Sequence, residues 1–405
     1  MRERSRNGGG MARHFEDWLQ AYIDYASYTE APKRFHFWSG VSAVAACLRR
    51  KAYFDQIFFK WFPNFFIILV APPGIVSKST TADVAMDLVK HIPDVKWGPQ
   101  IVTWQSLTTS FAAALEGYQL NGSYYQMSAI TTVSAELGNL LNPKDGDLIN
   151  LLITLWDGRD VKKETKMSGN DSVINPWFNI IGCTTPSWIA DNIPQNALEG
   201  GFASRCVWLY ADTKDKLVPH LEDVVPSDLD STKAKLIADL EKISKIGGRY
   251  RLSNAAKVWS AHWYADLWKG YNPDDVRMNG YFARKQTHLY KLSMVIAASH
   301  RDSLTLEKED LIAANDMLTD MEPGMPKVFE KIGRSDQSKQ VESFISYVRR
   351  KGEVSYEEAF RYLHAYFPME KDLEGIITGC IRSGFVELKT EHGPVLVAKF
   401  GATHA

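Results

Sequence analysis

Cysteine is scarce in this chain of 405 residues, and the four cysteines lie far apart along it. Their spacing matches no metal-ligand pattern, and three of the four sit in apolar runs. We therefore expect buried thiols, as in a protein of the reducing cytoplasm, rather than disulfides. The four residues are Cys47, Cys183, Cys206 and Cys380.

The chain also lacks a long hydrophobic run and a strong charge of either sign. An apolar segment such as 65–70 is far too short to cross a bilayer, so no membrane partner is expected. The first ten residues, MRERSRNGGG, contain no apolar segment, which excludes a secretory signal. We expect a disordered leader over 1–12, with Met11 as an alternative start. Because the formal net charge is −1, any surface for nucleic acid has to come from local basic patches.

What the chain does contain is a candidate phosphate-binding loop within residues 65–90. A buried strand is followed there by a turn with Gly74 and by a helix that opens with Lys78 and Ser79. In such loops backbone N–H groups surround phosphate oxygens, the lysine reaches the β and γ phosphates, and the hydroxyl binds Mg²⁺. The positive end of the helix adds to the attraction. The segment therefore predicts a site for ATP, with Mg²⁺ held by Ser79.

This loop departs from the usual pattern G-x-x-x-x-G-K-[ST], which would place glycines at Pro72 and Ser77. Gly74 is then the one flexible point, and Ser77 and Thr80 are expected to contact phosphate beside the Lys-Ser pair. The alternative is an ordinary strand–turn–helix in which Lys78 and the next serine cap a surface helix.

Short apolar strands alternate with helical stretches between residues 65 and 211, which predicts a mostly parallel α/β sheet. Ahead of it, residues 14–50 indicate two helices separated by a turn at Pro32. Behind it, a polar connection over 212–230 leads into a mainly helical region, and three helices followed by a hairpin close the chain in the order of a winged helix. The expected strands are 65–70, 100–103, 128–134, 177–183 and 206–211.

An ATP-hydrolysing site also needs a carboxylate on a neighbouring strand to polarise the attacking water. One strand ends in Ser134-Ala135-Glu136, so Glu136 stands where a catalytic base is expected. The preceding position, where an aspartate would hold Mg²⁺ through water, is Ala135. Either Mg²⁺ relies on Ser79, the phosphates and water, or hydrolysis is weak. The alternative role of Glu136 is to oppose the positive end of the short helix that follows.

Two further residues complete the expected site. Thr184 ends the next strand, where its hydroxyl would orient the water or touch the γ-phosphate, unless it caps the helix after Pro186. Arg205 precedes the last strand behind a Gly-Gly hinge, an arrangement suited to reaching ATP bound by a neighbouring subunit. The alternative for Arg205 is an ordinary surface ion pair.

These segments, in this order, resemble a family of helicase-like replication ATPases of phages and plasmids, often fused or adjacent to primase domains. They are WFPNFFIILVAPPG with KSTT, the S-A-E strand end, LWDGRD, NPWFNIIGCTTP and GGFASRCVWLY. The resemblance covers residues 31–330, and the ordered set is specific rather than any one motif. More distantly, the layout is similar to AAA+ replicative helicases of the minichromosome-maintenance and superfamily-3 kinds.

The resemblance implies an AAA+-like P-loop core with a mostly parallel sheet, and a ring of six subunits that bind ATP between neighbours in the cytoplasm of a bacterial host. Ser204-Arg205 matches the pair that carries the arginine finger. FARKQTHLYKLSMVIAASH resembles the lid helix and suggests Arg284 as a second sensor arginine. The expected parts are a leader over 1–12, N-terminal helices over 13–60, the ATPase core over 61–212, a helical lid over 213–334 and a winged-helix domain over 335–405.

A basic segment between the strands that carry Glu136 and Thr184, VKKETKMSGNDSV, is predicted to form a hairpin. In the helicases that the chain resembles, an insertion at this place enters the central channel and grips DNA. Lys162, Lys163 and Lys166 would then supply positive charge for DNA phosphates. The alternative is a solvated hairpin with ordinary surface lysines.

Two other basic positions are ambiguous. Arg159 would contact the nucleotide of a neighbour, or pair with Asp157 or Asp160. The last helix of the C-terminal part, expected over 370–383, would lie in a major groove, but its acidic residues favour a protein contact at least as much.

Together these features predict an ATP-driven motor on DNA, a ring-forming replicative helicase of a phage or mobile element. It would act on a single strand or a fork, with a primase as a further partner. Two alternatives stay open. One is a nucleotide-dependent DNA-binding protein or loader in which Ala135 signals slow hydrolysis. The other is a non-catalytic replication protein whose phosphate loop is vestigial.

Overall fold

The computed structural model describes residues 12–165, 169–193, 201–271, 276–329, 336–364, 366–367, 369–389 and 394–398. It divides into two compact units, Met1–Ile332 and Gly333–Ala405. The N-terminal helices, core and lid expected from the sequence therefore lie in one unit, and the expected last boundary, after residue 334, is two residues from the observed one.

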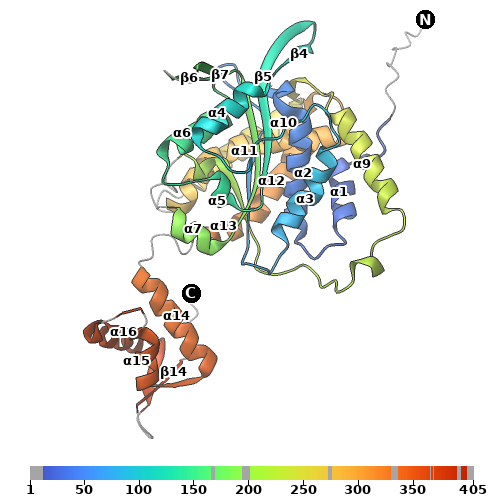
Figure 1. The fold of residues 1–405 in the computed structure, drawn as a ribbon. Helices are drawn as coiled ribbons and strands as arrows, with labels where there is room; N and C mark the ends of the chain where they lie inside the picture. Colours follow the sequence, from blue (N-terminus) through green and yellow to red (C-terminus); the bar gives the residue numbers. More distant parts are fainter. Residues whose placement is uncertain are drawn as a thin grey trace, which may run out of the picture. The chain divides into compact units, whose positions relative to one another are not determined.

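A five-stranded sheet forms the centre of the larger unit, in the order β4-β5-β8-β3-β9. Strands β5, β8, β3 and β9 run parallel, while β4 pairs antiparallel with β5. Helices lie on both sides of the sheet, and every residue of β3 is buried, as a central parallel strand requires (Figure 1). The strands are β3 (Phe66–Val70), β4 (Leu115–Leu120), β5 (Ser123–Ser134), β8 (Pro176–Thr184) and β9 (Cys206–Tyr210).

The α/β class and the mostly parallel sheet are thus confirmed, but one expected strand is wrong. Residues 100–103 form no strand, because Thr103 instead caps helix α4 (Trp104–Ala113) in a reciprocal capping box with Ser106. Nearby, Trp97 makes an isolated parallel bridge to Thr131 of β5. The edge next to β5 is taken by β4, which the sequence did not predict.

A second sheet of four short strands, in the order β11-β10-β1-β2, was also not predicted. Its pairs join segments far apart in the chain, since Ala52 lies opposite Gly248 and Arg251 lies opposite Thr305. The strands are β1 (Ala52–Asp55), β2 (Lys60–Trp61), β10 (Gly248–Leu252) and β11 (Thr305–Leu306).

The two helices expected within residues 14–50 are confirmed, and Pro32 is the N-cap of the second. The helices of the larger unit are α1 (Trp18–Ala26), α2 (Lys33–Leu48), α3 (Lys78–Val89), α4 (Trp104–Ala113), α5 (Leu137–Leu140), α6 (Gly146–Trp156), α7 (Pro186–Asn192), α9 (Leu229–Ile243), α10 (Asn254–Lys269), α11 (Val276–His300), α12 (Lys308–Met321) and α13 (Met325–Phe329). Within the described residues, the 3₁₀ turns of this unit are η1 (Arg49–Lys51), η2 (Ala203–Arg205), η3 (Leu221–Asp223) and η4 (Glu322–Gly324).

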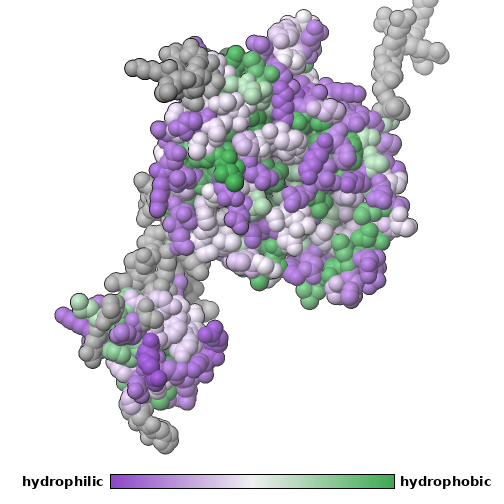
Figure 2. All heavy atoms as spheres, in the orientation of Figure 1, coloured by the Kyte–Doolittle hydropathy of each residue, from purple (hydrophilic) through white to green (hydrophobic). Residues whose placement is uncertain are grey.

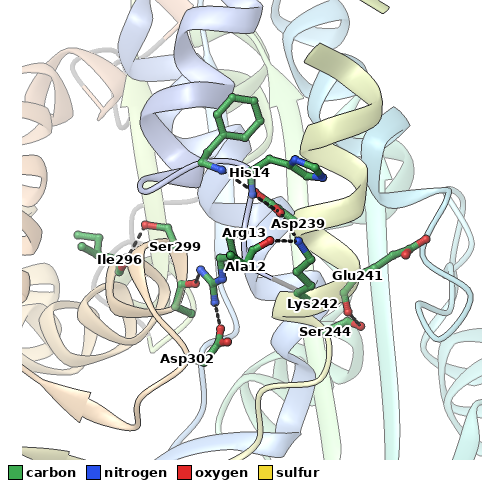
Figure 3. A network of polar contacts seen from close by, with 12 residues as sticks. Ala12, Arg13, His14, Asp239, Glu241, Lys242, Ser244, Ile296, Ser299 and Asp302 are labelled. Atoms are coloured by element: carbon green, nitrogen blue, oxygen red, sulfur yellow. Dashed lines mark hydrogen bonds and ion pairs between the residues drawn. The ribbon is translucent and has the colours of Figure 1, made fainter. Parts of the chain in front are cut away.

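The first described residues are fixed to α9 by a buried carboxylate (Figure 3). Asp239 is fully buried and accepts hydrogen bonds from the backbone N–H groups of His14 and Phe15 at 2.9 Å. Lys242 pairs with Asp239 at 3.1 Å and donates to the carbonyl of Ala12 at 2.7 Å. Of the expected leader, residues 1–11 lie outside the described part of the chain.

The hairpin expected between β5 and β8 is confirmed as β6 (Val161–Thr165) paired antiparallel with β7 (Gly169–Val173). The side chain of Lys162 is exposed. Lys166 lies outside the described residues, as does the side chain of Lys163.

The four cysteines are buried free thiols, as expected. Among the helices that the structure describes, none has both the length and the apolar character to span a bilayer. On the face shown in Figure 2, hydrophilic residues cover most of the larger unit, and hydrophobic residues form small separate groups.

The C-terminal unit has its own hydrophobic core around Phe344, Leu363 and Leu373. Three helices, α14 (Asp336–Lys351), α15 (Tyr356–His364) and α16 (Glu370–Arg382), and the hairpin of β13 (Val386–Lys389) and β14 (Val395–Ala398) confirm the predicted order. The sequence missed β12 (Glu353–Ser355), which pairs with β14 and completes a three-stranded antiparallel sheet.

Candidate nucleotide-binding site

One cavity of the larger unit lies at the carboxyl ends of three adjacent parallel strands, β3, β8 and β5. Its volume is about 510 Å³. Ligands of open α/β sheets bind at this edge, in the crevice beyond the strand ends. All the residues expected at the nucleotide site line it, except Arg205 and Arg284: they are Gly74, Ser77, Lys78, Ser79, Thr80, Glu136 and Thr184.

The register of the sheet explains why residues so far apart in sequence meet here. Val70, the last residue of β3, lies opposite Thr184, the last residue of β8. Ser134, the last residue of β5, lies opposite Gly182. The three chains therefore leave the sheet at the same edge, and the loop after β3 and the residues after β5 enter one cavity.

The loop between β3 and α3 turns at Gly74, whose φ of 71° favours glycine. The Lys78 ammonium folds back over this loop and donates to the carbonyls of Ala71 at 2.9 Å and Pro72 at 3.3 Å. Burial lowers the pKa of Lys78 from its usual value, opposed by the nearby Cys183 thiol. An anion in the cavity would offset this desolvation, so the lysine suits a phosphate ligand.

Helix α3 begins at the cavity with its N-terminus free of a side-chain cap. Ser77 occupies the N-cap and makes no side-chain cap hydrogen bond. The first N–H groups of a helix have no partner within the helix, and the positive end of its dipole attracts anions. Ser79 and Thr80, which also line the cavity, place their backbone N–H groups and hydroxyls in this first turn.

Glu136 follows β5 and its side chain is exposed at the cavity. It is the N-cap residue of α5, yet it makes no side-chain cap hydrogen bond to that four-residue helix. Among the described residues that line the cavity, it is the one carboxylate, and Ala135 beside it contributes no ligand for a metal. The carboxylate is therefore available to a bound ligand or to water.

Thr184 is buried at the end of β8, with 7% of its surface exposed. The alternative role given to Thr184, capping the following helix, is wrong, because Thr185 is the N-cap residue. The Thr185 hydroxyl accepts a hydrogen bond from the N–H of Trp188 at 3.2 Å at the start of α7. The Thr184 hydroxyl therefore remains at the cavity wall.

Arg205 is not at this cavity. It ends η2, immediately before β9, and the parallel pairing of Cys206 with Phe66 places it at the amino edge of the sheet. The five-residue β3 separates the two edges by roughly 13 Å. The Arg205 side chain is 6% exposed and makes a two-pronged ion pair with Asp157, Nε to Oδ1 and Nη2 to Oδ2, both 2.9 Å.

The ion pair expected as the alternative for Arg205 therefore exists, but it is buried rather than on the surface. Gly200 of the expected hinge lies outside the described residues, whereas the carbonyl of Gly201 accepts a hydrogen bond from Arg205 Nη1 at 2.6 Å.

Arg284 also lies at the amino edge, in a cluster of cations around the indole of Trp156. The ring centroid is 5.7 Å from Arg284, 5.4 Å from Arg205 and 3.5 Å from Lys291. Burial, reinforced by the charge of Arg205, lowers the pKa of Arg284. The fully buried Lys291 donates to the backbone and side-chain oxygens of Asn64, and burial holds its pKa far below the usual value.

Trp188, which lines the cavity from the first turn of α7, was not predicted from the sequence. A side chain at Gly138 would come within 2.8 Å of the Trp188 indole nitrogen, so this glycine leaves room for the ring. The signal was present in Thr185-Pro186, because a threonine N-cap with proline at the first helical position fixes where the helix starts.

Comparison of the chain with protein-family models and with curated protein sequences finds no match. The fold defines the chain as an α/β protein with a mostly parallel central sheet.

Proposed function

We propose that this chain binds and hydrolyses ATP in the cavity at the ends of β3, β5 and β8, and uses the energy to move along DNA. The observation that carries the proposal is that Lys78 and Glu136, from separate strand ends, line one cavity. A lysine and a helix N-terminus on one side with a free carboxylate on the other are the groups that phosphoryl transfer to water requires.

The residues divide the work of hydrolysis as follows. Lys78 and the first N–H groups of α3 hold the phosphates and offset their charge. Glu136 accepts the proton of the attacking water, and the Thr184 hydroxyl orients that water. Mg²⁺, held by the Ser79 hydroxyl, would neutralise charge on the phosphates, and an oxygen donor such as this hydroxyl suits the cation.

A second candidate is a nucleotide-dependent DNA-binding protein or loader with weak hydrolysis. It is favoured by the single carboxylate among the described residues of the cavity, since Ala135 stands where an aspartate would hold Mg²⁺. In that case ATP would govern assembly rather than movement.

The proposal also includes an AAA+-like ring, a lid, a winged-helix domain and a primase partner. In a ring, the amino edge of one subunit would serve the ATP of its neighbour. Arg205 is the proposed trans-acting residue, and it would first have to leave Asp157. Arg159 pairs more loosely with Asp157, at 3.6 Å, and its side chain is 76% exposed. The hairpin with Lys162 would contact DNA phosphates.

The hydrolysis proposal is tested by measuring release of phosphate from ATP with and without a forked oligonucleotide. Lys78→Ala should reduce turnover by about 100-fold or more, because it removes the cation of the phosphate loop. Lys90→Ala is the matched control, since Lys90 is the C-cap residue at the far end of the same helix. Glu136→Gln should bind ATP normally yet hydrolyse it about 100-fold or more slowly. Equal turnover in wild type and Lys78→Ala would refute the proposal.

Strand separation and assembly distinguish the candidates. A motor should be stimulated by DNA and separate a forked duplex. A loader should form larger assemblies with ATP, seen by light scattering, without separating strands. No binding of labelled ATP by the wild type would select a non-catalytic replication protein instead.

A further inference from the structure

A second cavity, of about 780 Å³, lies at the amino edge of the sheet, away from the nucleotide site. Its walls are the turn between β1 and β2, the segment from Trp156 to Arg159 after α6, and one face of α11. The residues proposed to bind phosphate, Mg²⁺ and the attacking water within one subunit all line the other cavity.

Positive charge dominates the lining. Lys60, Arg159 and Arg284 line the cavity, together with Arg50. The one carboxylate among its described lining residues, Asp157, is already paired with the buried Arg205 outside the lining. Electrostatic complementarity therefore favours an anionic ligand.

Backbone carbonyls fix one of these cations. Arg50 donates to the carbonyl of Pro176 at 2.7 Å and to that of Gly158 at 3.1 Å, with its guanidinium 3.9 Å from the ring centroid of Phe62. The cavity lining therefore already contains a cation stacked on an aromatic ring and held by two backbone carbonyls.

Aromatic rings form a continuous column that ends at the cavity. Phe54 stacks on Tyr290 with ring centroids 4.7 Å apart, and Tyr290 stacks on Trp61 at 5.4 Å. Phe59 then contacts Trp61 at 5.3 Å. Phe54 and Tyr290 are buried, whereas Phe59 is 51% exposed and Phe58 is 94% exposed. The column thus begins in the core and presents its last ring, Phe59, to solvent, where Phe58 of the same turn is also exposed.

The turn that carries these rings is held in a strained form. Ile57 has a φ of 70°, a conformation that a β-branched residue rarely adopts. The turn is closed by hydrogen bonds from Ile57 N–H to the Asp55 carboxylate and from Gln56 N–H to the Phe59 carbonyl, both 2.9 Å. Strain of this kind persists where the surroundings impose it, and it occurs at ligand-binding sites.

We propose that this cavity binds a single strand of DNA, with a base stacked on Phe58 or Phe59 and phosphates contacted by Lys60, Arg159 and Arg284. Exposed aromatic rings beside cations are the means by which proteins hold single strands without regard to sequence. The choice of DNA as the polymer rests on the proposed function.

The chain path favours a strand over a free nucleotide. Arg159 lies in the cavity wall, two residues before the start of β6, and β6 carries the exposed Lys162. The cationic surface therefore continues from the cavity onto the hairpin, as a polymer of phosphates requires. Because Phe58 lines the cavity and is almost fully exposed, a ligand can extend beyond it on the side of the turn.

The test is fluorescence anisotropy with a labelled oligothymidylate of about 20 nucleotides, without ATP. Phe58→Ala should weaken binding about 5- to 100-fold. Arg159→Gln should weaken it and reduce the slope of log affinity against log salt by about 1. The matched controls are Ile101→Ala, an apolar residue 74% exposed, and Arg251→Gln, an exposed arginine, neither of which lines the cavity. Both controls should bind like the wild type.

The result separates this site from the proposed function. Lys78→Ala should bind the oligonucleotide normally even though it lacks hydrolysis, so a loss of ATPase activity alone leaves the cavity assignment standing. Unchanged binding in both Phe58→Ala and Arg159→Gln, with DNA-stimulated hydrolysis intact in the wild type, would overturn the site while leaving the motor. If thymidine monophosphate competes as well as unlabelled oligothymidylate at the same concentration of nucleotide units, the assignment of a DNA strand as the ligand is overturned. A change of assembly size in Phe58→Ala without a change in DNA affinity would overturn it as well, because the turn would then be a protein contact.

Discussion

Replacing Arg205 by alanine should destabilise the larger unit, because the guanidinium neutralises a carboxylate that is itself almost buried. The Asp157 side chain is 12% exposed, and both of its oxygens accept hydrogen bonds from Arg205 at 2.9 Å. Without the arginine, Asp157 keeps a contact with Arg159 at 3.6 Å. The carboxylate would then be desolvated, with Arg159 as a weak and mostly exposed ion-pair partner and with the more distant charges of Arg284 and Lys291.

The structure sets the size of this effect. Hydrogen bonds that involve a charged group contribute about 1.5–3 kcal/mol each, and removing one member of a buried ion pair costs about 3–5 kcal/mol. Because Arg159 compensates in part, we expect Arg205→Ala to lower the free energy of unfolding by about 3 kcal/mol, at the lower end of that range. Asp157→Ala instead leaves Arg205 without its carboxylate partner. The double variant should lower the free energy of unfolding by about 1–3 kcal/mol less than the sum of the two single variants.

Urea titration followed by circular dichroism measures these differences, with Arg251→Ala as the control for an exposed arginine, expected within about 0.5 kcal/mol of the wild type. Added salt should change the Arg205 effect little, because the pair is buried. If Arg205→Ala proves as stable as the wild type, the ion pair does not hold the fold. Full stability together with lost ATP hydrolysis would instead assign Arg205 to the ATP of a neighbouring subunit.

Two further predictions concern stability. Burial lowers the pKa of His36 to about 4, against about 6.5 in the unfolded chain, so the stability linked to its neutral form is complete above pH 6.5 and is lost, by up to about 3 kcal/mol, as the pH falls toward 4. The free energy of unfolding of His36→Gln should accordingly fall less steeply over this range, and an unchanged slope would exclude His36 as the cause. Gly98→Ala should cost about 1–3 kcal/mol in thermal melts, because its Cβ would collide with Thr132 and come within 2.5 Å of Ile130 Cγ2. Gly146→Ala has open space around it at the start of α6 and should be neutral or stabilising by up to about 1 kcal/mol, so equal costs at both glycines would contradict the packing argument.

The nucleotide cavity could be predicted from the sequence because its residues follow buried strands. Continuous apolar runs such as Phe66–Val70 indicate parallel strands covered on both faces. The carboxyl ends of parallel strands meet at one edge, so Lys78, Glu136 and Thr184 were expected together before the order of the strands was known. This prediction required only that the strands be parallel, and not their order in the sheet.

The strands that were not predicted from the sequence are those whose pairing depends on segments distant in the chain. Leu115–Leu120 alternates between exposed and half-buried residues and gains its place only by pairing with β5. Strands β1 and β10 are short and form by pairing with each other, although they lie far apart in the sequence. Conversely, the apolar and β-branched residues within 100–103 predicted a strand. They form none, because Thr103 hydrogen-bonds within the first turn of α4.

The position of Arg205 follows from the same rule that located the cavity, applied in reverse. Residues that follow parallel strands gather at one edge, so a residue that precedes such a strand must lie at the other. The partner of Arg205 could not be predicted from the sequence, because Asp157 lies in a different connection, after α6.

Strand β3 nevertheless runs from one edge to the other, as its parallel neighbours do. Asn64, just before β3, donates to the carbonyl of Trp156 at 3.1 Å and accepts from the buried Lys291, while the carboxyl end of β3 leads into the phosphate loop. A shift of β3 by a ligand at the loop would therefore reach the cations around Trp156 through one buried, fully packed strand. In the proposed motor, β3 and the hydrogen bonds of Asn64 are one direct connection between the bound nucleotide and the cavity proposed for DNA.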